Sequence, residues 1–432
     1  MDPPRPKRHF SPMAARGTHG RPDPADVIVV GGGMVGGALA LALAAGGLAV
    51  ALVDRTPLPS LAAAAYDGRA SAVAYASQRL LAQIGLWREV EHAAEPILDI
   101  RVSDGASSLF LHYDHRELGG ALEGAPFGWI VENGAIRRGL AALLEAAPNV
   151  RVLAPATAGR MSVGDPAAGL ALDDGTALAA PLIVAADGAE SALRAQARIA
   201  AVQWRYPQDG IVCTMGHEAP HDGIAHERFL PAGPFAVLPM TDAPDGTHRS
   251  SIVWTERDER APGVMRLSDA AFGAEMQRRF GDWYGAVQVL GGRWRYPLRL
   301  LHAERYVGPR FALIGDAAHT IHPIAGQGLN LGLRDVAALA EVVVDDRRLG
   351  LDHGALPTLQ RYERWRRPDN AALMAVTDGL NRLFSNDIGP VRLARDLGLA
   401  AVDRMPGLKR LFMQHAMGTV GALPRLLRGE AL

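Results

Sequence analysis

The stretch that decides the fold reads Val27-Ile-Val-Val-Gly-Gly-Gly-Met-Val-Gly-Gly37, followed by an alanine- and leucine-rich run to residue 45. The β-branched run predicts a short buried strand, and the residues after the glycines favour a helix. Between them lies the pattern Gly31-x-Gly33-x-x-Gly36. In this pattern the first glycine permits a tight turn, the second lets the backbone approach a pyrophosphate, and the third lets helix and strand pack closely. The stretch therefore predicts a dinucleotide-binding strand–turn–helix unit.

The chain continues into a second strand that ends at an acid. Gly46 and Gly47 stop the helix, residues 48–53 form an apolar run, and Asp54 follows it. An acid here can bind a ribose 2′-hydroxyl and disfavours a 2′-phosphate, so we expect adenosine of the FAD or NAD type rather than NADP. No charged residue occurs between Asp26 and Asp54. The length would allow a membrane span, but the alternation of strand, glycine turn, helix and strand argues against one.

Two distant segments repeat the strand-to-acid pattern. One reads Leu182-Ile-Val-Ala-Ala-Asp187-Gly188, and the other reads Phe311-Ala-Leu-Ile-Gly315-Asp316. An acid at the end of the second strand can accept hydrogen bonds from the ribityl hydroxyls of a flavin. These segments therefore favour a flavin over a nicotinamide as the bound dinucleotide.

A glycine-containing loop follows Asp316. It carries Pro323, Gly326, Gln327 and Gly328, and it leads through Leu329 and Asn330 into a helix predicted over about residues 329–344. Glycines in this loop would let its backbone lie against a flat ring system. The positive end of the following helix would stabilise the anion that forms when a flavin is reduced. We therefore expect this loop beside the flavin ring.

Composition restricts the class of protein further. The chain has 432 residues with 45 Lys+Arg against 46 Asp+Glu, so a strong field for nucleic acid is not expected. Cys213 is the single cysteine, which excludes an internal disulfide framework and a cysteine-ligated metal cluster and favours a reducing, cytoplasmic location. We predict no metal site, and we interpret His319 and His322 as structural.

Residues 1–24 lack the apolar core of a signal peptide and are expected to be a disordered extension.

Longer motifs give the chain a resemblance to a known family. It resembles the flavoprotein aromatic hydroxylases of the para-hydroxybenzoate hydroxylase fold and, within them, the ubiquinone-biosynthesis hydroxylases. Besides the glycine and acid motifs above, the resemblance rests on Asp67-Gly-Arg69, Gly128-Trp-Ile-Val-Glu-Asn133, Glu227-Arg-Phe-Leu-Pro-Ala-Gly-Pro-Phe-Ala-Val-Leu-Pro239, Gly315-Asp316-Ala-Ala-His319, Tyr362-Glu-Arg-Trp-Arg-Arg-Pro-Asp-Asn370 and Leu383-Phe-Ser-Asn386. One departure is Asp54, where this family more often has Glu.

The resemblance implies an α/β fold with three parts. Residues 25–100, 126–200 and 297–345 would assemble a Rossmann-like FAD-binding domain from discontinuous segments. Residues 101–125 and 201–296 would form a mixed-sheet substrate domain, and residues 346–432 a helical C-terminal region. Arg69 is expected to lie near the flavin, and Arg138 is expected to contact the cofactor, although the adjacent Arg137 leaves that register open.

The resemblance also implies an activity. A flavin C4a-hydroperoxide formed with O₂ would hydroxylate the ring of a phenolic, polyprenylated ubiquinone precursor, with NAD(P)H or a protein reductase as electron donor. A soluble aromatic-acid hydroxylase and a non-catalytic flavin-binding scaffold of a ubiquinone-synthesis complex remain as alternatives. Residues 406–428 combine apolar residues at helical spacing with basic residues. They could join a complex or the surface of the inner membrane, or pack on their own domain.

Overall fold

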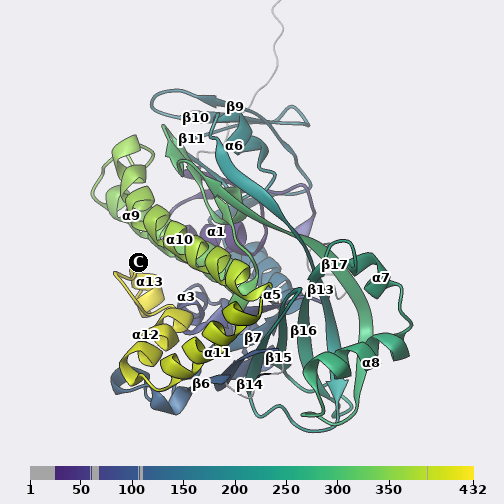
Figure 1. Cartoon of the computed structure of the whole chain (residues 1–432). Helices are drawn as coiled ribbons and strands as arrows, with labels where there is room; N and C mark the ends of the chain where they lie inside the picture. The colour runs from purple at the N-terminus through teal and green to yellow at the C-terminus, as the bar shows by residue number, and fades with distance from the viewer. Residues whose placement is uncertain (1–24, 59, 61–67, 106, 108–109, 387) are drawn as a thin grey trace, which may run out of the picture.

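A computed structural model describes residues 25–58, 60, 68–105, 107, 110–386 and 388–432 (Figure 1). The extension expected over residues 1–24 and Asp67 of the Asp67-Gly-Arg69 motif lie outside the described residues.

The first sheet brings together strands that are far apart in the sequence. Its order is β18-β19-β12-β1-β2-β8, and the strands from β19 to β8 run parallel. The strands are β1 (Val27–Val30), β2 (Val50–Val53), β8 (Val150–Leu153), β12 (Leu182–Ala185), β18 (Val307–Gly308) and β19 (Phe311–Leu313). β1, β2, β12 and β19 are completely buried, as their continuous apolar sequences require in a covered parallel sheet. The predicted α/β fold from discontinuous segments is confirmed.

Three helices cover this sheet. α1 (Met34–Ala45) packs against both α5 (Asn133–Ala146) and α9 (Gly328–Arg348). Both faces of α1 are apolar, and its residues from Gly36 to Leu43 are buried. This is the burial pattern of a helix enclosed on several sides.

The second sheet is mixed and has eight strands. Its order is β20-β17-β13-β16-β15-β14-β5-β6, with β5 and β14 parallel and the other neighbours antiparallel. The strands are β5 (Asp99–Asp104), β6 (Phe110–Asp114), β13 (Ala201–His217), β14 (Ile224–Leu230), β15 (Gly233–Met240), β16 (His248–Arg257), β17 (Val287–Ala303) and β20 (His319–Thr320). One face of this sheet packs against α7 (Ala261–Met265) and α8 (Asp269–Phe280) through Trp254, Phe272 and Met276.

The long pair β13–β17 extends the mixed sheet across the boundary that we expected between two domains. β17 pairs with β13 from Val287 opposite His217 to Ala303 opposite Ala201. The boundary that we expected between residues 296 and 297 therefore falls inside one strand. The β13–β17 ladder has register shifts between Arg205 and Asp209 and between Cys213 and Thr214, and both of its strands belong to the mixed sheet.

Two smaller sheets and three short helices complete this part of the molecule. One sheet contains β9 (Ala158–Val163), β10 (Ala168–Leu172) and β11 (Ala177–Ala180); the other contains β3 (Ala70–Ala74), β4 (Ala94–Ile97) and β7 (Gly128–Glu132). The helices are α3 (Tyr75–Gln83), α4 (Leu86–Val90) and α6 (Ala192–Gln196).

The C-terminal region consists of α10 (Leu356–Phe384), α11 (Gly389–Asp403), α12 (Pro406–Met417) and α13 (Arg425–Arg428). Figure 1 shows α10 lying alongside α9, and α11 lies against β6. The apolar and basic pattern of residues 406–428 is not one helix, because the chain turns at Gly418 with φ of +75°. α12 instead buries Met413 and Met417 against the protein's own core.

Two basic residues of these last helices form ion pairs with other parts of the protein. Lys409 is buried and lies 2.8 Å from Glu117 Oε2, and Arg425 pairs with Asp345 and Glu341. These two cations therefore hold the C-terminal region on the rest of the fold.

Candidate active site

The three glycines of the first loop meet different surroundings. Gly31 has φ of +105°, and a Cβ there would lie 2.3 Å from the carbonyl oxygen of Ala186. A Cβ at Gly36 would lie 1.9 Å from the Gly31 carbonyl oxygen. A Cβ at Gly33 would meet no atom within 4 Å, and Gly33 lines the main cavity of the molecule. Gly31 and Gly36 thus permit close packing, and Gly33 leaves space at the start of α1 where a phosphate can lie.

Asp54 at the end of β2 holds the glycine loop. Its Oδ2 accepts a hydrogen bond from the Gly32 amide at 2.6 Å, and its Oδ1 accepts one from the Thr56 amide at 2.7 Å. Because each carboxylate oxygen can accept more than one hydrogen bond, this arrangement leaves capacity for a ribose hydroxyl. The predicted role of Asp54 towards ribose stays a prediction.

The register of the two arginines on α5 is now fixed. Arg137 lines a small cavity together with Gly32, Gly33 and Met34, whereas Arg138 is exposed. Adjacent residues on a helix point about 100° apart, so only one of them can face the loop. The structure therefore places Arg137 rather than Arg138 beside the glycine loop, and a contact of either arginine with the cofactor stays a prediction.

The second segment supplies an unsatisfied acceptor. Asp187 Oδ1 is buried without a hydrogen-bond partner among the described residues, and its Oδ2 accepts a long hydrogen bond of 3.4 Å from the Leu193 amide. The next residue, Gly188, lines the main cavity with φ of +87° and open space where a Cβ would be. A buried carboxylate oxygen without a partner requires an explanation, and a bound ligand or a water molecule would supply one.

The third segment brings Asp316 to the cavity wall. Its side chain is open to the cavity but is otherwise surrounded by protein. This burial raises the pKa of Asp316, although His319 and Arg299 act to lower it. Gly315, with φ of +56°, makes the turn that follows β19.

A buried ion-pair network that the sequence did not reveal supports this turn. Asp335 on α9 accepts hydrogen bonds from the Gly315 amide (3.0 Å) and from Arg366 Nε on α10 (2.9 Å), and it also pairs with His319. Burial alone would raise the pKa of Asp335, but His319 and Arg366 outweigh it and lower the pKa. His319 therefore serves the fold through Asp335.

Tyr362 and Asn370 extend the network along α10. The Tyr362 hydroxyl donates to the Leu313 carbonyl at 2.8 Å, and Asn370 Nδ2 donates to Asp335 Oδ1 at 3.3 Å. Both residues belong to the Tyr362–Asn370 motif on which the family resemblance rests. Each residue is separated by tens of positions in the sequence from the residue that it contacts. A local sequence pattern therefore could not assign a role to either of them.

The loop before α9 faces the same cavity. Pro323, Gly326, Gln327, Gly328 and Leu329 all line it, and α9 begins at Gly328. A Cβ at Gly328 would meet no atom within 4 Å. The backbone of this loop and the positively polarised N-terminal end of α9 therefore both face the cavity.

Asn330 fixes this loop to the neighbouring sheet. Its Oδ1 accepts from the Ala74 amide at 2.9 Å, and its Nδ2 donates to the Ala72 carbonyl at 2.8 Å. Asn330 lines the cavity, but its side chain is occupied with β3 rather than free for a cofactor.

Arg69, at the start of β3, also lines the cavity. Its guanidinium lies 5.1 Å from the centre of the Tyr296 ring on β17. The preceding Gly68 has φ of +70°, and a Cβ there would lie 2.2 Å from the Trp294 ring. The Gly68–Arg69 backbone thus packs against β17, between the two large sheets.

Gly33, Gly188, Arg69, Asp316 and the loop before α9 line one continuous cavity of about 1110 Å³. It begins at Gly33, passes Asp316 and the loop before α9, and continues beneath the face of the mixed sheet that is turned away from α8. There the wall is largely apolar, and includes Val212, Ala225, Phe229, Ala236, Leu238 and Val253. At its far end the wall is completed by the C-terminal helices, with Phe384, Leu399, Val402, Phe412 and Ala416.

The sequence was then compared with known proteins. The profile of the FAD binding domain family matches residues 24–375. The ubiquinone hydroxylase UbiL of Rhodospirillum rubrum is 52% identical over 413 residues, which is 94% of each chain. The 3-demethoxyubiquinol 3-hydroxylase of Escherichia coli is 36% identical, over 91% of this chain and 99% of the relative.

The chain belongs to the ubiquinone-biosynthesis family of FAD-dependent hydroxylases.

The fold of this hydroxylase also has solved counterparts. The p-nitrophenol 4-monooxygenase PnpA of Pseudomonas putida superimposes with a TM-score of 0.75 at 19% identity, covering 92% of this chain and 99% of that one. The likeness at this level of identity concerns the fold alone.

The cavity of the hydroxylase fits FAD. Gly33, Gly188 and Gly328 each leave open space where a side chain would otherwise project, and all three line the cavity. The cavity-facing Asp316 supplies an acceptor for hydroxyl groups, and Asp187, with its unpartnered Oδ1, directly precedes Gly188 on the cavity wall. With Arg69 and the start of α9, these residues would hold the cofactor, although their contacts to it stay predictions.

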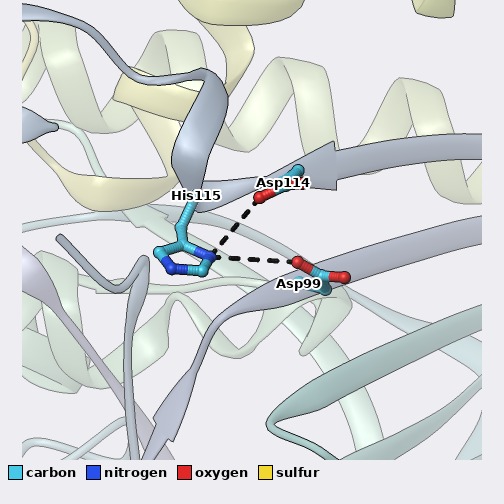
Figure 2. Close-up of side chains that lie close together, drawn as sticks. All are labelled: Asp99, Asp114 and His115. Carbon is cyan, nitrogen blue, oxygen red and sulfur yellow. Dashed lines mark ion pairs between the residues drawn. The ribbon is translucent and has the colours of Figure 1, made fainter. Parts of the chain in front are cut away.

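One cluster among the described residues has the spacing of a three-ligand metal site. It consists of Asp99, Asp114 and His115, and Figure 2 shows one ring nitrogen of His115 directed at both carboxylates. That nitrogen, Nδ1, lies 2.9 Å from the Leu98 carbonyl oxygen and must carry a proton to donate to it, which leaves no lone pair for a metal. Hydrogen bonds from Arg116 lower the pKa of Asp114 to about 2. We interpret the cluster as ion pairing that joins β5 to β6.

Proposed function

We propose that this hydroxylase uses FAD and O₂ to add a hydroxyl group to the aromatic ring of a polyprenylated phenolic ubiquinone precursor. NAD(P)H or a protein reductase would supply the electrons. The observation that carries the proposal is the single cavity that joins the FAD-binding loops to an apolar wall and continues to the C-terminal helices. A ring would lie beside the loop before α9, and an apolar tail would follow the wall.

FAD supplies the redox chemistry and the activation of oxygen when it is bound. The chain's own residues have simpler tasks. The glycine loop and Asp316 hold the dinucleotide, the start of α9 presents a positive end to it, and the apolar face of the mixed sheet excludes water from the ring.

A soluble aromatic-acid hydroxylase is supported less well by the cavity. An aromatic acid requires a cation for its carboxylate, and the cavity wall includes Arg69 and Arg395. Arg395 Nε is already 2.7 Å from Asp104 Oδ2, and its Nη1 donates to the Leu383 carbonyl. Arg69 lies over the Tyr296 ring. The wall is otherwise suited to a hydrocarbon chain.

The proposed substrate can be tested with purified holoenzyme under ¹⁸O₂. A phenol carrying a short prenyl chain, the same ring with a carboxylate in place of the chain, and a buffer control are each supplied with a chemical or enzymatic electron donor. We expect one ¹⁸O atom in the prenylated product and none in the aromatic acid. Hydroxylation of the acid alone would support the soluble hydroxylase. FAD reduction without any hydroxylated product would support the scaffold.

We further propose that α11 and α12 place the end of the cavity against the surface of a bilayer in which such a substrate is dissolved. Leu397 on α11 is 57% exposed, and Leu411 and Phe412 on α12 are each 43% exposed. Phe412 also lines the cavity, so apolar side chains continue from the cavity to the exterior. No helix in the described part of the chain is long and apolar enough to span a membrane.

Flotation with liposomes of anionic and zwitterionic lipids tests this contact. Leu397→Glu combined with Leu411→Glu should reduce the fraction of holoenzyme that floats, because charged side chains resist burial among acyl chains. Trp283→Glu, at a residue that is 65% exposed after α8, is the control. Equal flotation of all three proteins would contradict the proposal. Truncation after Asn386 is unsuitable, because it removes the buried Met413 and Met417.

A further inference from the structure

The apolar wall of the cavity contains one carboxyl group on the mixed sheet. Glu227 lies on β14, and it lines the cavity with Ala225 and Phe229, two residues before and two after it. Side chains two apart on a strand share a face. The residues opposite Glu227 in the neighbouring strands are Val102 on β5 and Ala236 on β15. The carboxyl therefore stands on the wall among apolar side chains.

Glu227 makes no hydrogen bond or ion pair with any residue that the structure describes. The other ionisable groups that line the cavity are Tyr113 on β6, Arg395 on α11 with its partner Asp104, Arg69 over the Tyr296 ring, Asp316 and His226. His226 is next to Glu227 on β14, but its Nε2 lies 3.2 Å from the Tyr284 hydroxyl. Because neighbouring side chains on a strand point to opposite faces, the His226 ring lies on the other side of the sheet from Glu227. Burial alone raises the pKa of Glu227 to about 7, without a contribution from any charged neighbour. A lone carboxyl in such a wall weakens the fold rather than supporting it.

A second candidate base directly precedes Pro323 but does not line the cavity. His322 is fully buried, and neither of its ring nitrogens has a hydrogen-bond partner among the described residues. It stands edge-on to Tyr206 and is absent from the cavity wall. Of His322 and Glu227, it is Glu227 that lines the cavity.

We propose that the Glu227 carboxylate binds the phenolic hydroxyl of the substrate and accepts its proton. This inference rests on the proposed function. In the step, the O–H bond of the phenol breaks, the proton goes to a carboxylate oxygen of Glu227, and the electron pair stays on the phenolic oxygen. The ring carbons ortho and para to that oxygen become more electron-rich, which is what an electrophilic oxygen donor requires. A general base acts best when its pKa is close to the working pH, and Glu227 meets that condition.

Glu227→Gln tests the proposal, because glutamine keeps the shape and the hydrogen-bonding ability but cannot take a proton. Glu259→Gln, at an exposed residue after β16, is the matched control. In the wild type, the rate of hydroxylation should rise with pH through about 7, as the carboxyl loses its proton. Glu227→Gln should lower kcat roughly 10²-fold or more, leave KM nearly unchanged, and remove that rise. FAD content and the rate of FAD reduction should not change.

A second readout needs no turnover. A prenylated phenol with ¹³C at the hydroxyl-bearing carbon is bound to oxidised holoenzyme, and its chemical shift is followed by NMR as the pH is varied. The wild type and Glu259→Gln should show a titration step near pH 7, and Glu227→Gln should show none. If the wild type hydroxylates but Glu227→Gln retains its rate, pH profile and titration step, the inference fails. If the wild type itself never hydroxylates, the proposed function fails instead.

Discussion

Gly31, Gly33 and Gly36 form one motif in the sequence but differ in what a side chain would meet. Gly36 lies against the Gly31 carbonyl and Gly31 against the Ala186 carbonyl, whereas Gly33 faces open space in the cavity. The effects of adding a methyl group should therefore separate folding from cofactor binding.

Gly33→Ala should fold normally but lose at least tenfold in FAD affinity, about 1.4 kcal/mol, because the new methyl occupies space for the pyrophosphate. Flavin absorbance per protein and the FAD dissociation constant measure this. Gly379→Ala is the control, since Gly379 is exposed within α10 and a Cβ there meets no atom within 4 Å. It should keep FAD and gain about 0.5–1 kcal/mol of stability. Unchanged FAD affinity in Gly33→Ala would refute the assignment.

At the scale of elements, the buried Asp335 carboxylate on α9 links Arg366 on α10 to the turn at Gly315. Asp335 is fully buried, and Arg366 is 4% exposed. Removing one partner of such a pair leaves the other charge buried and uncompensated.

Arg366→Ala should therefore lower the free energy of unfolding by about 3–5 kcal/mol, as measured by urea denaturation of the protein at pH 7. The surface pair of Arg278 with Glu275 provides the control, since the Arg278 side chain is 70% exposed. Arg278→Ala should cost less than about 1 kcal/mol. Equal costs for the two variants would show that the network is not important for stability.

The pH dependence of this network has a definite sign. In the folded state the pKa of Asp335 is lowered below its ordinary value of 3.8. The stability that the network contributes to the fold is therefore fully present above pH 3.8, and it is lost as the pH falls through the pKa of the folded state. The stability difference between wild type and Arg366→Ala should thus shrink in acid. A difference that grows towards low pH would contradict the assigned direction.

At the scale of the whole molecule, one cavity is lined both by loops that follow strands of the parallel sheet and by the mixed sheet. A ligand that contacts both sheets should therefore stabilise both sheets against unfolding. The expected gain in the free energy of unfolding is about 2.7 kcal/mol when the ligand concentration is a hundredfold above its dissociation constant.

Hydrogen exchange with and without excess FAD checks this coupling. We expect increased protection in β1 and β12 of the parallel sheet and also in β14–β16 of the mixed sheet. Riboflavin at the same concentration lacks the pyrophosphate and adenosine and is the control. Protection confined to residues 27–53 would mean that the sheets respond independently.

The sequence alone determined the fold class and the family, and both are confirmed. The reason is that the glycine loop and the ends of β2, β12 and β19 follow local rules: a turn requires glycine, and a buried strand requires continuous apolar residues. Their positions around one cavity agree with the expected FAD site, whose individual contacts stay predictions.

Only the tertiary structure decided which side chains face one another across long separations in the chain. It placed Arg137 rather than Arg138 at the glycine loop, paired Asp335 with Arg366, and left Glu227 alone on the cavity wall. It also divided residues 406–428 into α12 and α13 and placed Lys409 in an internal ion pair. A periodic pattern reports that a side chain is polar or apolar, but its partner is set by how helices and sheets pack, and that information is not local.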